Sequence, residues 1–256
     1  ETIVPFIKKH GGDIFINADV KEISIKNNTA NGVILSNADF IESKNVISST
    51  GVVNTLTNLV KNHKTFNKDL LNTVAPTESY ICLYIGLNHS YKDLELKDTN
   101  LWIYDDYNHD KNVQNSLEDI SHPFPVVYIS FPSIKDPKWN KENPNKTTME
   151  AITMSSINWY KEWHNKEWKN RGETYDDFKK NLTNRILESV YKHVPQIKGK
   201  IDYMELSTPL TVKNLANYKA GEMYGLEHGP ERFRQKWLKP KTPVKNLFLT
   251  GQDVTT

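Results

Sequence analysis

The chain has 256 residues, which is enough for one large domain or two ordinary ones. Its 33 basic and 31 acidic residues nearly cancel, which argues against a protein that binds nucleic acid through a basic field. Aromatic residues make up 11% of the chain and can supply a packed core, so we exclude disorder.

Cys82 is the only cysteine, which excludes intrachain disulfides. It lies among apolar residues, so we expect a packed and inert thiol. A single cysteine is typical of a reducing compartment or of a cysteine-poor secreted protein, and we expect a cytoplasmic or peripherally membrane-associated protein. No apolar run reaches the length of a membrane span.

The first part of the chain predicts a helix and several short strands. Residues 2–10 have helical spacing of apolar side chains, and residues 13–17 form an apolar run that predicts a short buried strand. Apolar residues alternate between 19 and 41, broken by Asn and Gly turns, and predict a three-stranded meander. Residues 45–51 predict a further strand, which ends at Thr50-Gly51.

The middle of the chain predicts an antiparallel sheet. A helical pattern broken by polar residues covers 52–71, and residues 105–116 form a polar loop. Strands are predicted at residues 79–87, 101–104, 126–131 and 149–154.

Two helices and a strand follow. The first helix covers residues 157–171, and its Trp and Tyr rows fit a helix that packs on a sheet better than the wall of a ligand cavity. The second has Thr174 as its N-cap and ends before Pro195. Its apolar face consists of Tyr175, Phe178, Leu182, Ile186 and Val190. Residues 201–206 predict a strand.

The end of the chain predicts a short buried strand, Leu247 to Leu249, after a loop-rich region. This strand ends at Thr250-Gly251, and an acid, Asp253, follows at once. A strand that ends at Gly-x-Asp lets a ligand approach the backbone and supplies a carboxylate beside it, although such turns are also common without any ligand.

The order of elements predicts an α/β plus α+β fold with one domain inserted into another. We expect residues 1–55 and 240–256 to form part of a Rossmann-like nucleotide-binding domain that carries the meander. We expect residues 56–239 to form an inserted substrate domain, an antiparallel sheet with helices. Since the chain lacks an initiator Met and begins inside an apparent helix, we expect a longer protein that includes it.

Several kinds of catalytic site are absent from the sequence. No two histidines are three or four residues apart, so no helix presents a pair of them to one metal ion. Asp106, Asn108 and Asp110 resemble the start of a calcium loop, but Lys111 replaces the required glycine, which favours a solvated loop. The glycine-rich phosphate fingerprints and the Gly-x-Ser-x-Gly elbow are also missing.

The stretch from Gly221 to His228 is a candidate functional loop. Glu222, Tyr224 and His228 lie among the glycines Gly221 and Gly225 in a segment without clear periodicity. So many hydrogen-bonding side chains exceed what a connecting loop needs, although a structural loop stays the alternative.

Seven short motifs occur in a fixed order along the second half of the chain: Ser130-Phe-Pro-Ser133 with Asp136-Pro137, Arg171-Gly172 with Tyr175, Thr208-Pro209-Leu-Thr211, Gly221-x-x-Tyr224-Gly225, Arg232-Phe233, Pro240-x-Thr242-Pro243 and Leu249-Thr-Gly-Gln-Asp253. Together they resemble the C-terminal half of the retinol saturase family, a flavin-dependent group related to carotenoid isomerases and bacterial phytoene desaturases. The resemblance covers essentially the whole chain.

The resemblance implies a two-domain enzyme that binds FAD, with the dinucleotide fingerprint upstream of Glu1. It implies that Val20 meets the adenine through its backbone. It places the strand end Ser49-Thr50-Gly51 near the cofactor, and Gly251, Gln252 and Asp253 near the ribityl–pyrophosphate region. Gln252 separates the glycine from the acid, whereas the more usual flavoprotein ending is Gly-Asp.

The resemblance also implies a hydrophobic polyene substrate, a retinoid or carotenoid, whose double bond is saturated or isomerised. NADPH or NADH would serve as electron donor. Delivery of hydride to one carbon requires a proton at the other, and we expect Tyr224, with Glu222 and His228 nearby, to supply it or to form the flavin-facing wall.

The residues leave two other functions open. Nothing in them sets the direction of electron flow, so a phytoene-type desaturase is one alternative. A non-enzymatic lipid-binding module without a working flavin site is the other. A polyene substrate is compatible with docking at a membrane surface, although no basic amphipathic helix indicates it. The sequence does not indicate the oligomeric state.

Overall fold

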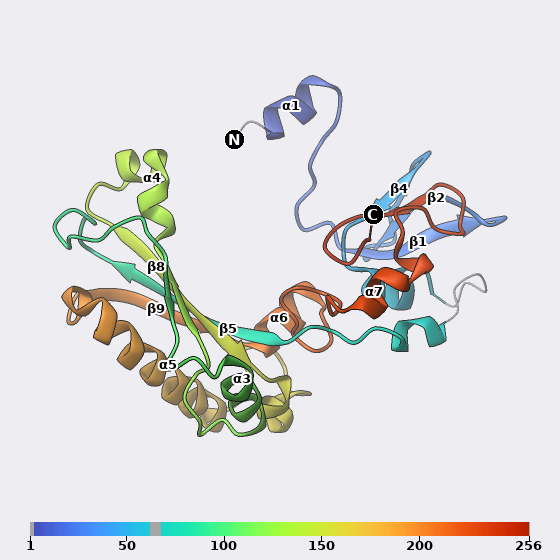
Figure 1. The fold of residues 1–256 in the computed structure, drawn as a ribbon. Helices are drawn as coiled ribbons and strands as arrows, with labels where there is room; N and C mark the ends of the chain where they lie inside the picture. Colours follow the sequence, from blue (N-terminus) through green and yellow to red (C-terminus); the bar gives the residue numbers. More distant parts are fainter. Residues whose placement is uncertain (1–2, 62–67, 256) are drawn as a thin grey trace. The chain divides into compact units, whose positions relative to one another are not determined.

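A computed structural model describes residues 3–61 and 68–255 (Figure 1). Its contacts divide the chain into two compact units. The first unit contains residues 1–75 and 226–256, and the second contains residues 76–225. The second unit is therefore inserted into the first, with division points that differ from the expected ones at 55/56 and 239/240.

The first unit contains the expected meander. The strands β1 (Val20–Lys26), β2 (Thr29–Leu35) and β3 (Phe40–Glu42) pair as antiparallel neighbours in this order. The turn between β1 and β2 uses Asn27 and Asn28, both with positive φ, a conformation that asparagine tolerates better than most residues.

A parallel pair of strands forms the second sheet of this unit. The strand β4 (Val46–Ser48) lies beside β10 (Leu247–Leu249), although about two hundred residues separate them in the chain. After β4 the chain turns at Gly51 into the short helix α2 (Val52–Asn54), which continues as a π-helix over Thr55–Leu59. The expected strands before Gly51 and Gly251 are thus confirmed. Part of the helical pattern expected at 52–71 lies outside the described residues.

The N-terminal segment differs from its prediction. The helix α1 (Ile3–Lys9) forms as expected but buries none of its side chains. Residues 13–17 form no strand, and Phe15 and Ile16 are 70% and 82% exposed, so the prediction of a buried strand here was wrong. Three consecutive apolar residues do not by themselves form a strand, because a strand needs a neighbour for its backbone hydrogen bonds. No described strand pairs with this segment.

The second unit is built on one five-stranded antiparallel sheet. Its order is β6-β7-β8-β5-β9, with β5 and β8 as the long central pair. The strands are β5 (Ser79–Leu87), β6 (Leu101–Ile103), β7 (Val127–Ser130), β8 (Thr147–Ser155) and β9 (Ile201–Ser207). Every second residue of β8 is buried, as expected when one face of a strand meets the core. The predicted antiparallel sheet is confirmed.

One long helix, α5 (Glu173–His193), runs along a face of this sheet (Figure 1). The predicted apolar face packs into the core, with Tyr175, Leu182, Ile186 and Val190 buried and Phe178 packed against them. The helix begins after Gly172 rather than at Thr174. The Oγ1 atom of Thr174 instead accepts a hydrogen bond of 3.1 Å from Nε1 of Trp163, so the predicted cap was wrong.

Two further local predictions were wrong. Residues 109–118 form a helix, α3 (His109–Glu118), instead of a polar loop, and this helix buries Ser116 and packs beside β8. The helix expected at 157–171 is a short 3-10 helix, Ile157–Trp163, with non-helical angles at Tyr160.

Aromatic packing explains the shortened helix. Tyr160 and Trp163 are buried against Phe178, with ring centroids at 5.3 and 5.1 Å. Trp159, Tyr160 and Trp163 therefore belong to the core of the second unit, whereas Trp168 lies outside it. The other short α-helices of the described residues include α4 (Pro137–Glu142), α6 (Pro209–Ala216) and α7 (Pro230–Arg234).

The packing of α5 generates a stability prediction. We expect Ile186→Ala to lower the free energy of unfolding by about 2–5 kcal/mol, because it leaves a cavity in a fully enclosed core. Urea unfolding followed by tryptophan fluorescence measures the change. Leu215→Ala, on the exposed surface of α6, is the control and should change stability by less than about 0.5 kcal/mol. Equal effects would contradict the described packing of α5.

Cys82 generates a pH prediction. It is buried in β5, and burial raises the pKa of its thiol to about 12. Because the pKa of the unfolded thiol is lower, about 8.5, its contribution to stability is complete below that pH and is lost as the pH rises toward 12. We expect wild-type stability to fall more between pH 8 and pH 10.5 than that of Cys82→Ala in urea titrations. Parallel falls in the two proteins would refute this.

Candidate functional site

The ends of the parallel strands β4 and β10 form the candidate site of the first unit. A backbone hydrogen bond joins the two strand ends, in which Thr250 N donates to Ser48 O at 2.9 Å. Beyond this bond, Gly51 and Gly251 take positive φ, +86° and +105°, so each chain turns sharply away. Ligands of parallel sheets bind at such carboxyl ends of strands.

The structure brings together two of the predicted segments here, Ser49–Gly51 and Gly251–Asp253. Ser49, Thr50, Gly251 and Gln252 are exposed. A Cβ added to Gly251 would find only Ser49 O within 4 Å, at 3.8 Å, so the space beside this glycine is open. The predicted residue Val20 lies in another sheet, at the start of β1 and opposite Leu35.

Asp253 differs from its exposed neighbours because it is buried. Its Oδ2 accepts a hydrogen bond from Val52 N at 2.8 Å, and its Oδ1 accepts one from Leu226 N at 2.9 Å. This one carboxylate therefore links the segment after β10 to the first residue of α2 and to Leu226, where the chain re-enters the first unit. The resemblance implied a contact with a cofactor, whereas these bonds join three parts of the protein itself.

Arg232 is a second buried charge in this unit, and the sequence indicated it only as part of an ordered motif. It is 4% exposed. Its Nη1 donates to Leu226 O at 2.7 Å, and its Nη2 donates to Gln252 O. His228 Nε2 lies 3.3 Å from Nη1.

The charge of Arg232 is incompletely matched. Its Nε is buried without a hydrogen-bond partner. Within residues 3–61 and 68–255, no ion pair involving this arginine is found. Since a buried guanidinium needs acceptors or a counter-ion, an anion close to Gln252 would stabilise this arrangement.

Hydroxyl groups support the turn after β4. Ser48 Oγ lies 2.7 Å from Thr55 Oγ1 and 3.2 Å from Thr50 Oγ1, and Thr55 Oγ1 also donates to Gly51 O. These bonds fix the backbone from which Ser49 and Thr50 are presented.

Two of the predicted catalytic residues, Glu222 and Tyr224, belong to the second unit, and His228 belongs to the first. Gly221 has a φ of +63°, and a Cβ there would lie 2.3 Å from Pro209 O, so only glycine fits. Glu222 is buried, and its Oε2 accepts a hydrogen bond from Ala220 N at 2.9 Å. These observations indicate that Glu222 shapes its own loop.

Tyr224 is 51% exposed and has a different environment. Its ring meets that of Tyr80 edge-on, with centroids 5.5 Å apart. Burial, and then the neighbouring Tyr224 and Glu78, raise the pKa of Tyr80. Tyr80 is therefore a neutral phenol beside Tyr224 at neutral pH, a pairing that sequence alone did not indicate.

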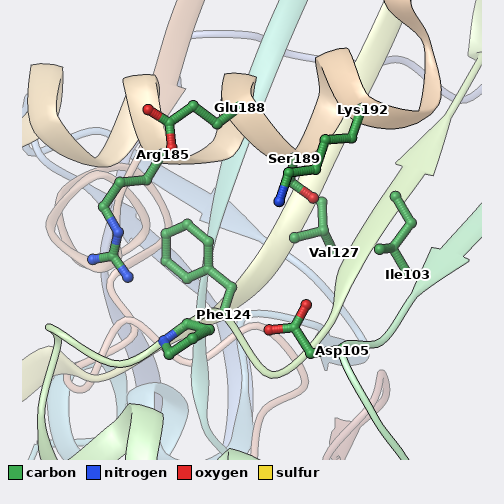
Figure 2. Close-up of a pocket in the computed structure, with 9 residues that line it drawn as sticks. Ile103, Asp105, Phe124, Val127, Arg185, Glu188, Ser189 and Lys192 are labelled. Carbon is green, nitrogen blue, oxygen red and sulfur yellow. The ribbon is translucent and has the colours of Figure 1, made fainter.

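A small cavity of about 170 Å³ lies between α5 and the strands β6 and β7 in the second unit. Figure 2 shows Arg185 reaching from α5 toward the ring of Phe124, and the guanidinium carbon lies 4.5 Å from the ring centroid. The guanidinium donates to Ile120 O and His122 O, both at 2.6 Å, so its charge already has acceptors. This arginine anchors a loop.

Two kinds of site are not found in the described parts of the chain. Residues 3–61 and 68–255 contain no cluster of three His, Cys, Asp or Glu side chains able to hold a metal ion. The same residues contain no helix that is both long and apolar enough to span a membrane.

Comparison with solved structures defines the class of fold. An oxidoreductase from Methanosarcina mazei matches 96% of the chain with a TM-score of 0.52 and 16% identity, over 46% of its own length. The chain thus has the mixed α/β fold of part of that protein. No family model matches the chain.

Comparison with curated sequences gives more specific relatives. An all-trans-retinol 13,14-reductase from Danio rerio is 31% identical over 98% of this chain, and an inactive all-trans-retinol 13,14-reductase from Danio rerio is 28% identical over 99%. A chloroplastic prolycopene isomerase from Daucus carota is 24% identical over 94%. The chain covers 44% of each Danio rerio protein and 37% of the carrot protein. The predicted resemblance to retinol saturases and carotenoid isomerases is confirmed.

Asp253 generates a prediction about this site. We expect Asp253→Asn to lower the free energy of unfolding by about 1–3 kcal/mol, because an amide nitrogen cannot accept the hydrogen bond from Val52 N or Leu226 N. Urea titration measures this. Glu227→Gln, an exposed acid in the same unit, is the control and should have little effect. A stability equal to wild type would show that the carboxylate does not hold these amides.

Proposed function

We propose that this chain forms part of an FAD-dependent oxidoreductase that acts on a C=C bond of a hydrophobic polyene, a retinoid or a carotenoid. The observation that carries the proposal is the similarity, over nearly the whole chain, to proteins named as retinol reductases and a carotenoid isomerase. The fold shared with an oxidoreductase supports it. The chain spans less than half of those relatives, so the activity is proposed for the longer protein.

The residues at the ends of β4 and β10 fit a dinucleotide cofactor. Two glycine turns lie at the carboxyl ends of parallel strands, and the space beside Gly251 is open, so backbone amides there can face a pyrophosphate. Arg232 is buried nearby with an unpartnered Nε, and an anionic cofactor would supply its missing counter-ion. In this proposal Ser49, Thr50, Gly251 and Gln252 contact the cofactor directly, and Asp253 positions their backbone.

We assign cofactor binding and substrate binding to different units of the chain. The first unit carries the cofactor, and the second, with its sheet and α5, carries the polyene. A bound flavin supplies hydride to one carbon of the conjugated system. The chain must then supply a proton to the other carbon and exclude water. Tyr224 is the proposed proton donor, since its hydroxyl is on an exposed side chain beside the neutral Tyr80.

A specific observation favours a second candidate function. One relative of almost equal similarity is named as an inactive reductase. Overall similarity therefore does not distinguish an enzyme from a non-enzymatic lipid-binding protein with the same fold. Desaturation of the polyene is the same chemistry in reverse and needs the same residues.

An absorption spectrum of the intact protein tests the proposal. We expect flavin bands that bleach with NADPH, NADH or dithionite under anaerobic conditions and return when a retinoid or carotenoid is added. Recovery with polyene supports reduction of the substrate, whereas bleaching of the oxidised flavin by polyene alone indicates a desaturase. A protein purified without flavin, and unable to bind added FAD, would refute the enzyme and support the lipid-binding protein.

Tyr224 generates a kinetic prediction in the intact enzyme. We expect Tyr224→Phe to slow reoxidation of the reduced flavin by substrate about 100-fold, which is the usual contribution of a positioned acid, with unchanged FAD content. Stopped-flow absorbance measures both quantities. Tyr107→Phe, on an almost fully exposed tyrosine, is the matched control. Equal rates in the two variants would remove Tyr224 as proton donor.

A further inference from the structure

A pocket of about 450 Å³ opens at the N-terminal end of α5, within the second unit. It lies at the motif Arg171-Gly172-x-x-Tyr175, which the proposed oxidoreductase activity does not use. Its lining includes Trp168, Arg171, Gly172, Tyr175 and Lys179.

Arg171 is the central charge of this pocket. It is 8% exposed, and its guanidinium carbon lies 5.2 Å from the ring centroid of Tyr175 and 5.8 Å from that of Trp168. Its Nη2 donates to Leu210 O at 3.5 Å, the long limit of a hydrogen bond, and its Nε is buried without a partner. In the described part of the chain no carboxylate lies within 4.0 Å of it.

Other cations gather around Arg171. Burial lowers the pKa of Lys179, and Arg171 lowers it further against the opposing effect of Glu205 and Asp176. Burial and Arg171 also lower the pKa of Lys213, whose Nζ lies 3.0 Å from both Nε2 and O of His164. Arg171 thus lies near two lysines, while no carboxylate is paired with it among the described residues, and burial of unpaired charge is costly.

The start of α5 adds a second source of positive potential. The helix has 21 residues, and its N-cap is Gly172, which has no side chain to accept hydrogen bonds from the first turn. A Cβ added to Gly172 would meet no atom within 4 Å, so the space above these amides is open. The amino end of a long helix attracts anions through its dipole and its unpaired N–H groups.

We propose that this pocket binds the phosphate group of a ligand. Arg171 and Lys179 neutralise its charge, and the amides at the start of α5 donate to its oxygens. Tetrahedral oxyanions suit this combination of a guanidinium fork and a helix amino end.

The acids of the pocket limit the rest of the ligand. Glu173, Asp176 and Glu205 also line it, and all three are exposed. They disfavour a polyanion and favour one phosphate attached to a neutral or cationic group. The cavity is larger than a phosphate ion, so such a group has room. A soluble phosphate ester and a phospholipid headgroup share this chemistry.

Binding is measured on the intact protein by isothermal titration with inorganic phosphate and glycerol 3-phosphate. Flotation with vesicles of phosphatidylcholine, with and without phosphatidic acid, tests the lipid source. We expect saturable binding to at least one phosphate probe, weakened at least tenfold by Lys179→Gln and by Arg171→Lys. Lys180→Gln, on an exposed neighbour outside the pocket, should bind like wild type.

Lys179→Gln keeps the test decisive if Arg171→Lys does not fold, because Lys179 is only half-buried. Binding to glycerol 3-phosphate would identify a soluble ligand, and flotation that depends on phosphatidic acid would identify a lipid. Flavin absorbance of the same variants should be unchanged, which separates this site from the proposed cofactor site. No saturable binding to any probe, or equal affinity in Lys179→Gln and Lys180→Gln, would overturn the proposal.

Discussion

The first unit depends on one buried carboxylate. Asp253 accepts the amide of Val52 on one oxygen and that of Leu226 on the other. Val52 is the first residue of α2, the helix after β4. Leu226 is the first residue after the inserted unit. Without this carboxylate, two buried N–H groups would lose their partners at the point where three chain segments meet. These two bonds fix the course of the chain beside the parallel pair β4–β10 and its two glycine turns.

Three arginines show how the surroundings of a guanidinium indicate its role. Arg185 donates to two carbonyls at 2.6 Å and packs on Phe124, so its charge is satisfied by the protein. Arg232 and Arg171 are more deeply buried, and each has an Nε without a partner. Folding a chain around an unmatched charge costs stability, and a bound anion is the simplest compensation. One such arginine lies in each unit, which is the basis for proposing two separate anionic ligands.

The sequence predicted those parts of the fold in which local pattern and packing agree. The long strand β5 is a continuous apolar run, the inward face of α5 has a period of 3.6 residues, and both formed as predicted. Residues 13–17 have a local pattern but no described partner strand, and the polar residues 109–118 form a helix that packs beside β8, so both predictions were wrong. The position of Asp253 was predictable, but its partners were not, because they lie 201 and 27 residues away in the chain. The buried state of Arg171 and Arg232 depends on such long-range packing as well.

A relative named as a reductase and one named as an inactive reductase are about equally similar to this chain, so overall similarity does not indicate which side chains matter. In the loop that begins at Gly221, the close approach to Pro209 and the bond from Ala220 N to Glu222 determine the course of the backbone. A buried acid that already accepts from its own loop is poorly suited to deliver a proton to an apolar substrate. Tyr224 is exposed on the same loop, whose backbone is held by Gly221 and Glu222. In the proposed reaction this loop positions Tyr224, and the hydroxyl of Tyr224 is the group that would transfer the proton.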